Sequence, residues 1–284
     1  MIEALLWVVD GTLAESERDG HRVAFNLAFE ACGLAWHWDE TRYGELLRIT
    51  GGRERLMHDM NSRSDAPVLA DQREALARAV HARKNVVYAN LVREGRIALR
   101  DGVMELMQQC RQRGLRMGIA TTTSRSSVQV LLEMNLGANW SSWFASIVCG
   151  EDVRSKKPDP EVYFRALREL GIGPLQAVAL EDSPGGVAAA RAADIAVVVT
   201  RSFYFANAPI DGTVAIGPGL HTREGWRPSL RAGARGNVAL PLPSIPSGDG
   251  RIRPALAPLS DGARVGLDDI LAWCAQMDTV SDFP

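Results

Sequence analysis

Between residues 103 and 199 the sequence alternates between helical and strand-like patterns, and this alternation strongly limits the folds available to the chain. Short apolar runs of strand length stand at 115–120, 145–149, 177–180 and 195–199, separated by stretches with helical spacing of apolar residues. Repeated β-α units build a parallel sheet covered by helices on both faces. We therefore expect an α/β fold with a doubly wound parallel sheet.

One further apolar run, residues 5–9, precedes this region and ends directly in Asp10-Gly11-Thr12. A strand here would place the Asp10 carboxylate at the carboxyl edge of the sheet, where open α/β sheets bind their ligands. Asp-Gly is also a common turn sequence, so a purely structural turn is the alternative.

Residues 15–95 show helical patterns and no convincing strand. The longest pattern runs from about residue 70 to residue 92, and Gly51-Gly52 forms a glycine-rich turn that opens another helix. We expect an all-helical cap, residues 15–95, inserted directly after the first strand into an α/β core made of residues 1–14 and 96–210.

The composition changes after residue 210. Half of the 14 prolines fall between residues 211 and 264, with several arginines and glycines, which predicts a poorly ordered extension. A solvated linker is one interpretation of its arginines, and an arm that binds a partner or nucleic acid is the other. Helical character returns at 267–277, so we expect residues 265–284 to form a C-terminal helix, able to dock on the core, and a tail.

Several classes of protein are disfavoured by composition. The net charge of −2 gives no basic field for nucleic acid. No apolar run reaches the ~18 residues of a membrane span, and the N-terminus lacks the pattern of a secretion signal. The four cysteines are scattered without CxxC spacing, which is typical of reduced thiols in the cytoplasm. The five histidines show no metal-binding spacing either. We expect a cytoplasmic monomer that binds a small molecule, with no nucleic acid or membrane partner.

Polar residues follow four of the predicted strands. These residues are Asp10, Thr121, Lys157 and the pair Glu181-Asp182. Each has a structural alternative: a turn, a helix cap, a surface lysine and a solvated helix start. Together they suit phosphoryl transfer, because paired acids and a backbone carbonyl bind Mg²⁺, while a lysine, a hydroxyl and a helix N-terminus hold phosphate oxygens.

This set of motifs resembles the haloacid dehalogenase (HAD) superfamily of phosphatases and phosphomutases over about residues 1–205. Further stretches resemble its CbbY branch, whose members are xylulose-1,5-bisphosphate phosphatases associated with carbon fixation by the Calvin cycle. They are Met1-Ile2-Glu3-Ala4, Asp10-Gly11-Thr12-Leu13-Ala14-Glu15, His21-Arg22 with Ala24-Phe25-Asn26, Thr50-Gly51-Gly52 with Glu54-Arg55, Ala120-Thr121-Thr122-Thr123-Ser124, Lys156-Lys157-Pro158 and Ala179-Leu180-Glu181-Asp182-Ser183. The resemblance implies a HAD-like core and Mg²⁺-dependent hydrolysis of a sugar phosphate.

The resemblance also implies a role for each residue at the strand ends. Asp10 would be the general acid/base, and its backbone carbonyl would bind Mg²⁺. Thr121 and Lys157 would hold the transferring phosphoryl group, and Glu181 and Asp182 would complete the metal site.

Candidates for binding the rest of the substrate lie mostly in the cap. Glu17, His21, Arg53 and Lys84 would contact the sugar and a distal phosphate, with Thr122 as a further candidate from the core. Surface charge is the alternative for Glu17 and Lys84. We expect the cap to close over the core before chemistry.

One position departs from the family motif Asp-x-Asp-Gly-Thr, because Val8 stands where the nucleophilic aspartate belongs. Valine cannot form an aspartyl-phosphate or bind the metal. Three explanations stay open: a protein that binds a phosphosugar without turnover, a compensating route such as metal-bound water, and an introduced or erroneous codon, since Asp and Val codons can differ by one base. A β-phosphoglucomutase-like activity is a further alternative, because such mutases share the cap, the lysine and the acidic pair.

Overall fold

The computed structural model describes residues 1–229 and 264–278. Its centre is a seven-stranded sheet of order β3-β2-β1-β4-β5-β6-β7, in which β1 to β6 are parallel and β7 is antiparallel to β6. The strands are β1 (Ala4–Trp7), β2 (Arg116–Ala120), β3 (Ser146–Val148), β4 (Ala177–Glu181), β5 (Ala196–Thr200), β6 (Ala215–Gly217) and β7 (Arg227–Pro228). The expected doubly wound α/β sheet is confirmed.

The central strand β1 shows why these apolar runs become buried strands. All four of its residues are fully buried, and successive side chains point to opposite faces of the sheet. Leu5 and Trp7 join the apolar cluster under α5 (Val103–Gln112), α6 (Arg125–Leu136) and α9 (Leu267–Asp278). Ala4 and Leu6 join the cluster under α7 (Glu161–Leu170) and α8 (Pro184–Ala192) on the other face. Short 3₁₀ helices at Trp140–Trp143 and Pro174–Gln176 complete this part of the fold.

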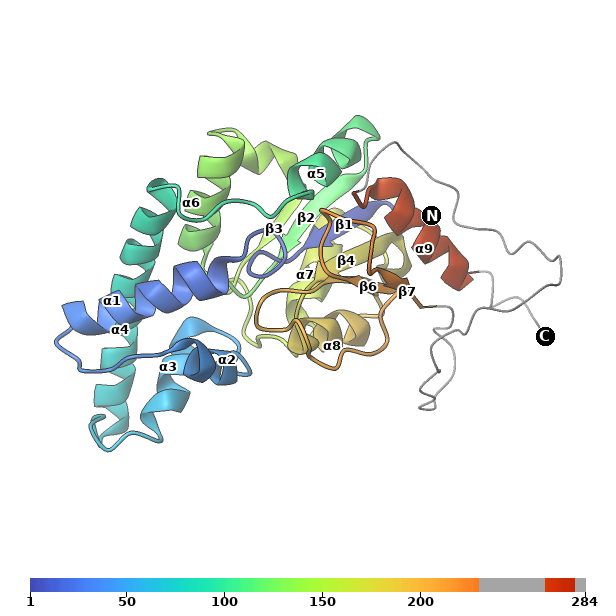
Figure 1. Cartoon of the computed structure of the whole chain (residues 1–284). Coiled ribbons are helices and arrows are strands. Elements are labelled where there is room, and N and C mark those ends of the chain that lie inside the picture. Colours follow the sequence, from blue (N-terminus) through green and yellow to red (C-terminus); the bar gives the residue numbers. More distant parts are fainter. Residues whose placement is uncertain (230–263, 279–284) are drawn as a thin grey trace.

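The chain between β1 and α5 is helical, and we call residues 15–95 the cap. Its elements are the π-helix η1 (Glu17–His21), α1 (Arg22–Ala31), α2 (Glu40–Leu46), α3 (Gly52–Met60) and α4 (Ala70–Arg93). They enclose an apolar cluster of their own, which includes Phe25, Phe29, Trp38 and Tyr43. Figure 1 shows the cap helices gathered beyond one end of the sheet, away from α9.

The expectation for the stretch after residue 210 is wrong in its first part. Residues 211–229 carry β6 and β7, and β6 pairs with β5 while Val214 and Ala215 are buried. The apolar run Val214-Ala215-Ile216 is too short to stand out beside the glycines and prolines around it. Residues 230–263 lie outside the described residues.

The C-terminal helix docks on the α/β core, as expected. Leu267, Ile270 and Trp273 of α9 belong to the apolar cluster on the α5 face of the sheet. The guanidinium of Arg113, directly after α5, donates a hydrogen bond of 2.8 Å to the carboxylate of Asp268 on α9. No helix in the described part of the chain is both long and apolar enough to span a membrane.

Candidate active site

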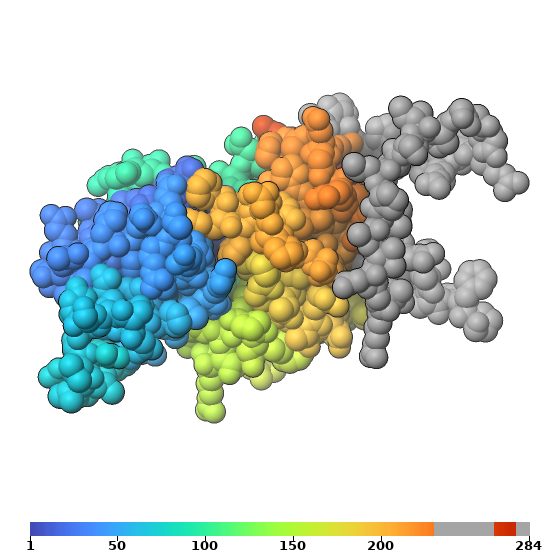
Figure 2. Space-filling model, turned by 60° about the horizontal axis from the view of Figure 1, so that its bottom comes forward, coloured from blue at the N-terminus to red at the C-terminus, as the bar shows by residue number. Residues whose placement is uncertain are grey.

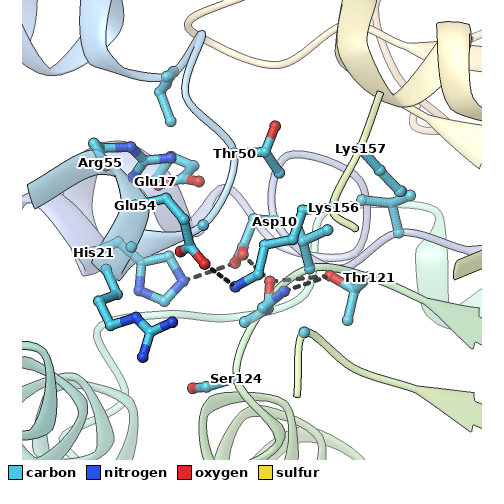
Figure 3. A pocket seen from close by; sticks show the side chains of 18 of the residues that line it. Asp10, Glu17, His21, Thr50, Glu54, Arg55, Thr121, Ser124, Lys156 and Lys157 are labelled. Carbon is cyan, nitrogen blue, oxygen red and sulfur yellow. Dashed lines mark hydrogen bonds and ion pairs between the residues drawn. The ribbon is translucent and has the colours of Figure 1, made fainter. Parts of the chain in front are cut away.

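A cavity of about 480 Å³ lies between the carboxyl edge of the sheet and the cap. Asp10, Thr121 and Lys157 line it from the core (Figure 3), after β1, β2 and β3 respectively. Asp182, directly after β4, also lines it. Glu181 is fully buried and does not line the cavity, but its carboxylate is hydrogen-bonded to Lys157, which does. The structure therefore brings the five predicted side chains to one place.

Asp10 is held by hydrogen bonds from both the cap and the core. The hydroxyls of Ser16 and Thr123 donate to its carboxylate, and His21 Nε2 lies 3.0 Å from its Oδ1 atom. Burial raises the pKa of Asp10, but the charge of His21 and these three hydrogen bonds outweigh it and hold the pKa well below its usual range. Asp10 is therefore an ionised, oriented carboxylate.

The loop after Asp10 needs a glycine. Gly11 has φ +78°, and a Cβ atom there would overlap the carboxylate of Asp182. This close approach keeps Asp182 beside the backbone of the Asp10-Gly11 segment, so the residue type at position 11 is set by both conformation and space.

Lys157 is the buried cation on the core side of the cavity. Its ammonium donates to Glu181 Oε1 at 2.6 Å and to the backbone oxygen of Ala120 at 3.0 Å. The hydroxyl of Tyr163 on α7 donates to the same carboxylate oxygen at 2.8 Å. Lys157 therefore lies next to the end of β2, where Thr121 begins the loop that leads into α6.

The acidic pair has the donor chemistry of a site for a hard cation. Asp182 takes part in no ion pair among the described residues, and its Oδ2 atom accepts a hydrogen bond of 2.7 Å from Ser202. Burial and the charge of Glu181 raise the pKa of Asp182 well above its usual value. Only Glu181 of these two adjacent buried acids has a lysine as its partner, so a divalent cation with oxygen ligands would balance the second carboxylate. Among the described residues, no three His, Cys, Asp or Glu side chains form a metal-binding group.

Val8 lines the same cavity with 8% of its surface exposed. Its backbone N–H donates to the oxygen of Leu180 at 3.1 Å, so the residue continues the pairing of β1 with β4. The side chain at this position faces the site that the acidic pair and Asp10 form, and it brings neither a charge nor a ligand atom.

The cap supplies two buried cations. The guanidinium of Arg55, on α3, donates to the hydroxyl of Tyr43 at 2.8 Å and lies 3.8 Å from Glu17. Lys84, on α4, forms no ion pair in the described part of the chain, and its ammonium lies above the rings of Phe25 and Tyr88. Burial lowers the pKa of Lys84 to about 8. An anion in the cavity would be the natural partner of this lysine.

The other predicted substrate-binding residues also line the cavity. His21 is buried and stacks on Tyr88, with ring centroids 4.1 Å apart. Arg53 is half exposed and pairs with Glu74 at 3.3 Å, so its charge is partly compensated. Glu17 and Thr122 complete the set.

Four residues at the site were not predicted from the sequence as site residues. Arg55 and Thr123 stand inside stretches that carry the resemblance, one turn into α3 and two residues after Thr121, and this position is the signal that could have identified them. Ser16 and His81 carry no such signal. Burial and the charge of Lys84 lower the pKa of His81 to about 4, so it is a neutral imidazole in the cavity wall.

Comparisons with known proteins agree with this architecture. A family model of haloacid dehalogenase-like hydrolases matches residues 2–194. The plasmid-encoded protein CbbY of Cupriavidus necator is 40% identical over 219 residues, which cover 77% of this chain and 86% of that protein. Protein CbbY of Cereibacter sphaeroides is 42% identical over 207 residues, covering 72% of this chain and 86% of that protein.

Solved structures give the same result. A crystal structure of CbbY from Rhodobacter sphaeroides in complex with phosphate is 40% identical, with a TM-score of 0.70, and covers 75% of this chain and 92% of that one. A mutant of that protein in complex with xylulose-1,5-bisphosphate is 39% identical, with a TM-score of 0.71, and covers 76% of this chain and 93% of that one. The chain thus belongs to the haloacid dehalogenase-like hydrolases and, within them, to the CbbY branch.

Proposed function

We propose that the cavity binds a sugar bisphosphate and is the site of a Mg²⁺-dependent phosphatase whose turnover Val8 reduces to little or none. The observation that supports this most strongly is the placement of buried cations on both sides of one cavity: Lys157 in the core, and Arg55 and Lys84 in the cap. Two separated cationic regions suit a ligand with a phosphate at each end. The relative that binds xylulose-1,5-bisphosphate makes this ketopentose bisphosphate the first substrate to test.

The core side would hold the phosphoryl group to be transferred. The Thr121 hydroxyl and the Lys157 ammonium lie there, beside the N-terminus of α6, whose first turn Ser124 caps. Mg²⁺ held by Asp182, Glu181 and the Asp10 backbone would neutralise charge on the phosphoryl oxygens. The ionised Asp10 carboxylate, oriented by Thr123 and His21, can accept and return a proton at this end of the cavity.

Val8 removes the step that such a site needs most. A side chain without lone pairs cannot attack phosphorus, so the residues around it bind and orient a phosphate ester without an acceptor for the phosphoryl group. Loss of a covalent nucleophile leaves only the catalysis that binding and electrostatics supply.

Restoring the nucleophile tests the proposal. We expect Val8→Asp to release inorganic phosphate from xylulose-1,5-bisphosphate with Mg²⁺, faster than the parent chain by about 10³-fold or more. Val8→Asn is the matched control, because it has nearly the same size and no nucleophilic carboxylate. A Val8→Asp protein that is folded yet inert towards a panel of phosphosugars with Mg²⁺ would overturn the phosphatase assignment.

The product distinguishes a phosphatase from a phosphomutase. Free phosphate from Val8→Asp supports hydrolysis, whereas an isomerised sugar phosphate without net phosphate release supports a β-phosphoglucomutase-like reaction. Phosphorus NMR of the reaction mixture separates these outcomes.

A second candidate function follows from Val8 itself: binding of a phosphosugar without turnover. Calorimetric titration of the parent chain with xylulose-1,5-bisphosphate measures it directly, and binding without phosphate release favours it. We also propose that the protein acts as a cytoplasmic monomer.

A further inference from the structure

The segment Ser202–Phe205, which follows β5, is part of the core but lies against the cap. In Figure 2 the gold and orange surface of this region meets the blue surface of the cap. We propose that this segment positions the cap side of the binding cavity, and that Tyr204 is its main positioning residue. This inference rests on the proposed function, because it assigns a role within the same site.

Three residues of the segment contact the cap. The backbone N–H of Phe203 donates to Glu15 at 3.0 Å, and the Arg18 guanidinium lies 4.5 Å from the centre of the Phe203 ring. The ring of Tyr204 lies 5.7 Å from that of Tyr43. Phe205 packs against the apolar cluster of the cap and lines the cavity.

The packing of Tyr204 on α2 is close. A Cβ atom at Gly44 would lie 3.0 Å from Cδ1 of Tyr204, so a glycine at this position lets the aromatic ring approach the helix backbone. A displacement of Tyr204 would therefore change the packing of α2 and of Tyr43.

The segment is fixed on its other side to the core. Ser202 donates a hydrogen bond of 2.7 Å to Asp182, and the guanidinium of Arg201 donates to the backbone oxygens of Phe205 and Ala208 at 2.8 and 3.0 Å. Arg100 donates to the backbone oxygen of Arg201 at 2.7 Å. These bonds hold the turn in a defined position relative to the acidic pair.

Tyr43 connects this turn with the cavity. It is fully buried, its hydroxyl donates to Glu17, and it accepts a hydrogen bond of 2.8 Å from Arg55. Glu17 and Arg55 both line the cavity from the cap side. Tyr204 thus packs on the residue that orients a buried cation and a carboxylate, although Tyr204 itself does not line the cavity.

This arrangement predicts a selective effect. Tyr204 packs on Tyr43, which is hydrogen-bonded to Arg55 and Glu17. The hydrogen bonds of Thr121 and Lys157 are made with other residues of the core. Loss of the Tyr204 ring should weaken binding of a ligand long enough to reach the cap, and it should leave binding of inorganic phosphate at the core unchanged.

The test uses the full chain and calorimetric titration with two probes, xylulose-1,5-bisphosphate and inorganic phosphate. We expect Tyr204→Ala to weaken bisphosphate binding by about tenfold or more without changing phosphate binding. Tyr204→Phe keeps the ring and should bind both probes like the parent chain. Phe164→Ala, an exposed aromatic residue on α7, is the control for loss of a ring elsewhere.

Each outcome separates the inference from the proposed function. A parent chain that binds neither probe contradicts the proposed function itself. A parent chain that binds the bisphosphate, with Tyr204→Ala binding it equally well, contradicts only the role of Tyr204. Equal weakening of both probes in Tyr204→Ala, or loss of bisphosphate binding in Tyr204→Phe, also contradicts it. Tyr204→Leu replaces Tyr204→Ala if the alanine variant does not fold by circular dichroism.

Discussion

At the scale of single residues, Lys157 and Glu181 form a buried ion pair at the candidate active site. The ammonium and the carboxylate lie 2.6 Å apart, with side-chain exposures of 5% and 0%. A charge removed from water to this degree needs its partner, because an unpaired buried ion costs several kcal/mol. The neighbouring Lys156 pairs with Glu54 at 3.0 Å, but both of these side chains are partly exposed.

These two adjacent lysines give a matched stability test. We expect Lys157→Met to lower the free energy of unfolding by about 3–5 kcal/mol, because Glu181 would remain buried without its cation. Lys156→Met should change it by less than about 1 kcal/mol, since a partly exposed pair is screened by water. Urea unfolding measures both values, and equal effects of the two substitutions would contradict the assignment of Lys157 as a buried structural cation.

Lys84 gives the site a pH dependence. Burial lowers the pKa of Lys84 to about 8, against partial compensation by the charge of Asp10. A bound phosphate favours the charged lysine, so affinity should be highest below about pH 8 and fall as the pH rises towards 9. Phosphate esters are already dianionic above about pH 7, so the ligand adds little to this change.

The measurement is the dissociation constant of xylulose-1,5-bisphosphate between pH 7 and pH 9. Lys84→Met should bind more weakly at pH 7 and lose most of the pH dependence. Lys156→Met keeps Lys84 and should retain that dependence. An unchanged pH profile in Lys84→Met would show that another group titrates.

At the scale of elements, α9 shows how a segment distant in sequence completes the fold. Trp273 on α9 is 5% exposed and stacks on Trp226, with ring centroids 4.8 Å apart. Asp269 on the same helix pairs with Arg223 at 2.9 Å. The helix therefore covers both α5 and the chain that leads into β7.

Removal of the Trp273 ring should be costly. We expect Trp273→Ala to lower the free energy of unfolding by about 3–5 kcal/mol, because a large buried aromatic side chain leaves a cavity. Leu175→Ala is the control: Leu175 is 81% exposed, and its loss should change stability by about 0.5 kcal/mol or less. Denaturant titration followed by tryptophan fluorescence and circular dichroism measures the free energy of unfolding of both variants. An unchanged free energy of unfolding in Trp273→Ala would mean that α9 adds little to the stability of the core.

At the scale of the whole molecule, the site exists only where the cap and the α/β core meet. The hydrogen bond between Asp10 and His21 joins the two parts at the floor of the cavity, and the contact of Tyr204 with Tyr43 joins them at its side. The cap has its own apolar cluster, so it can move as a unit while these contacts form or break. We expect such a closure to bring the cations of the cap towards the phosphate-binding end of the core.

The sequence by itself determined the class of fold and the floor of the site. Alternating apolar runs and helical patterns define a parallel sheet, and residues such as Asp10, Thr121 and Lys157 stand at strand ends, where topology forces them together. The tertiary structure alone decided that Arg55 and His81 also line the cavity, that Val214-Ala215-Ile216 adds a strand, and that Tyr204 packs on Tyr43. Local patterns encode which face of an element is buried, whereas contacts between distant segments depend on how the whole chain packs.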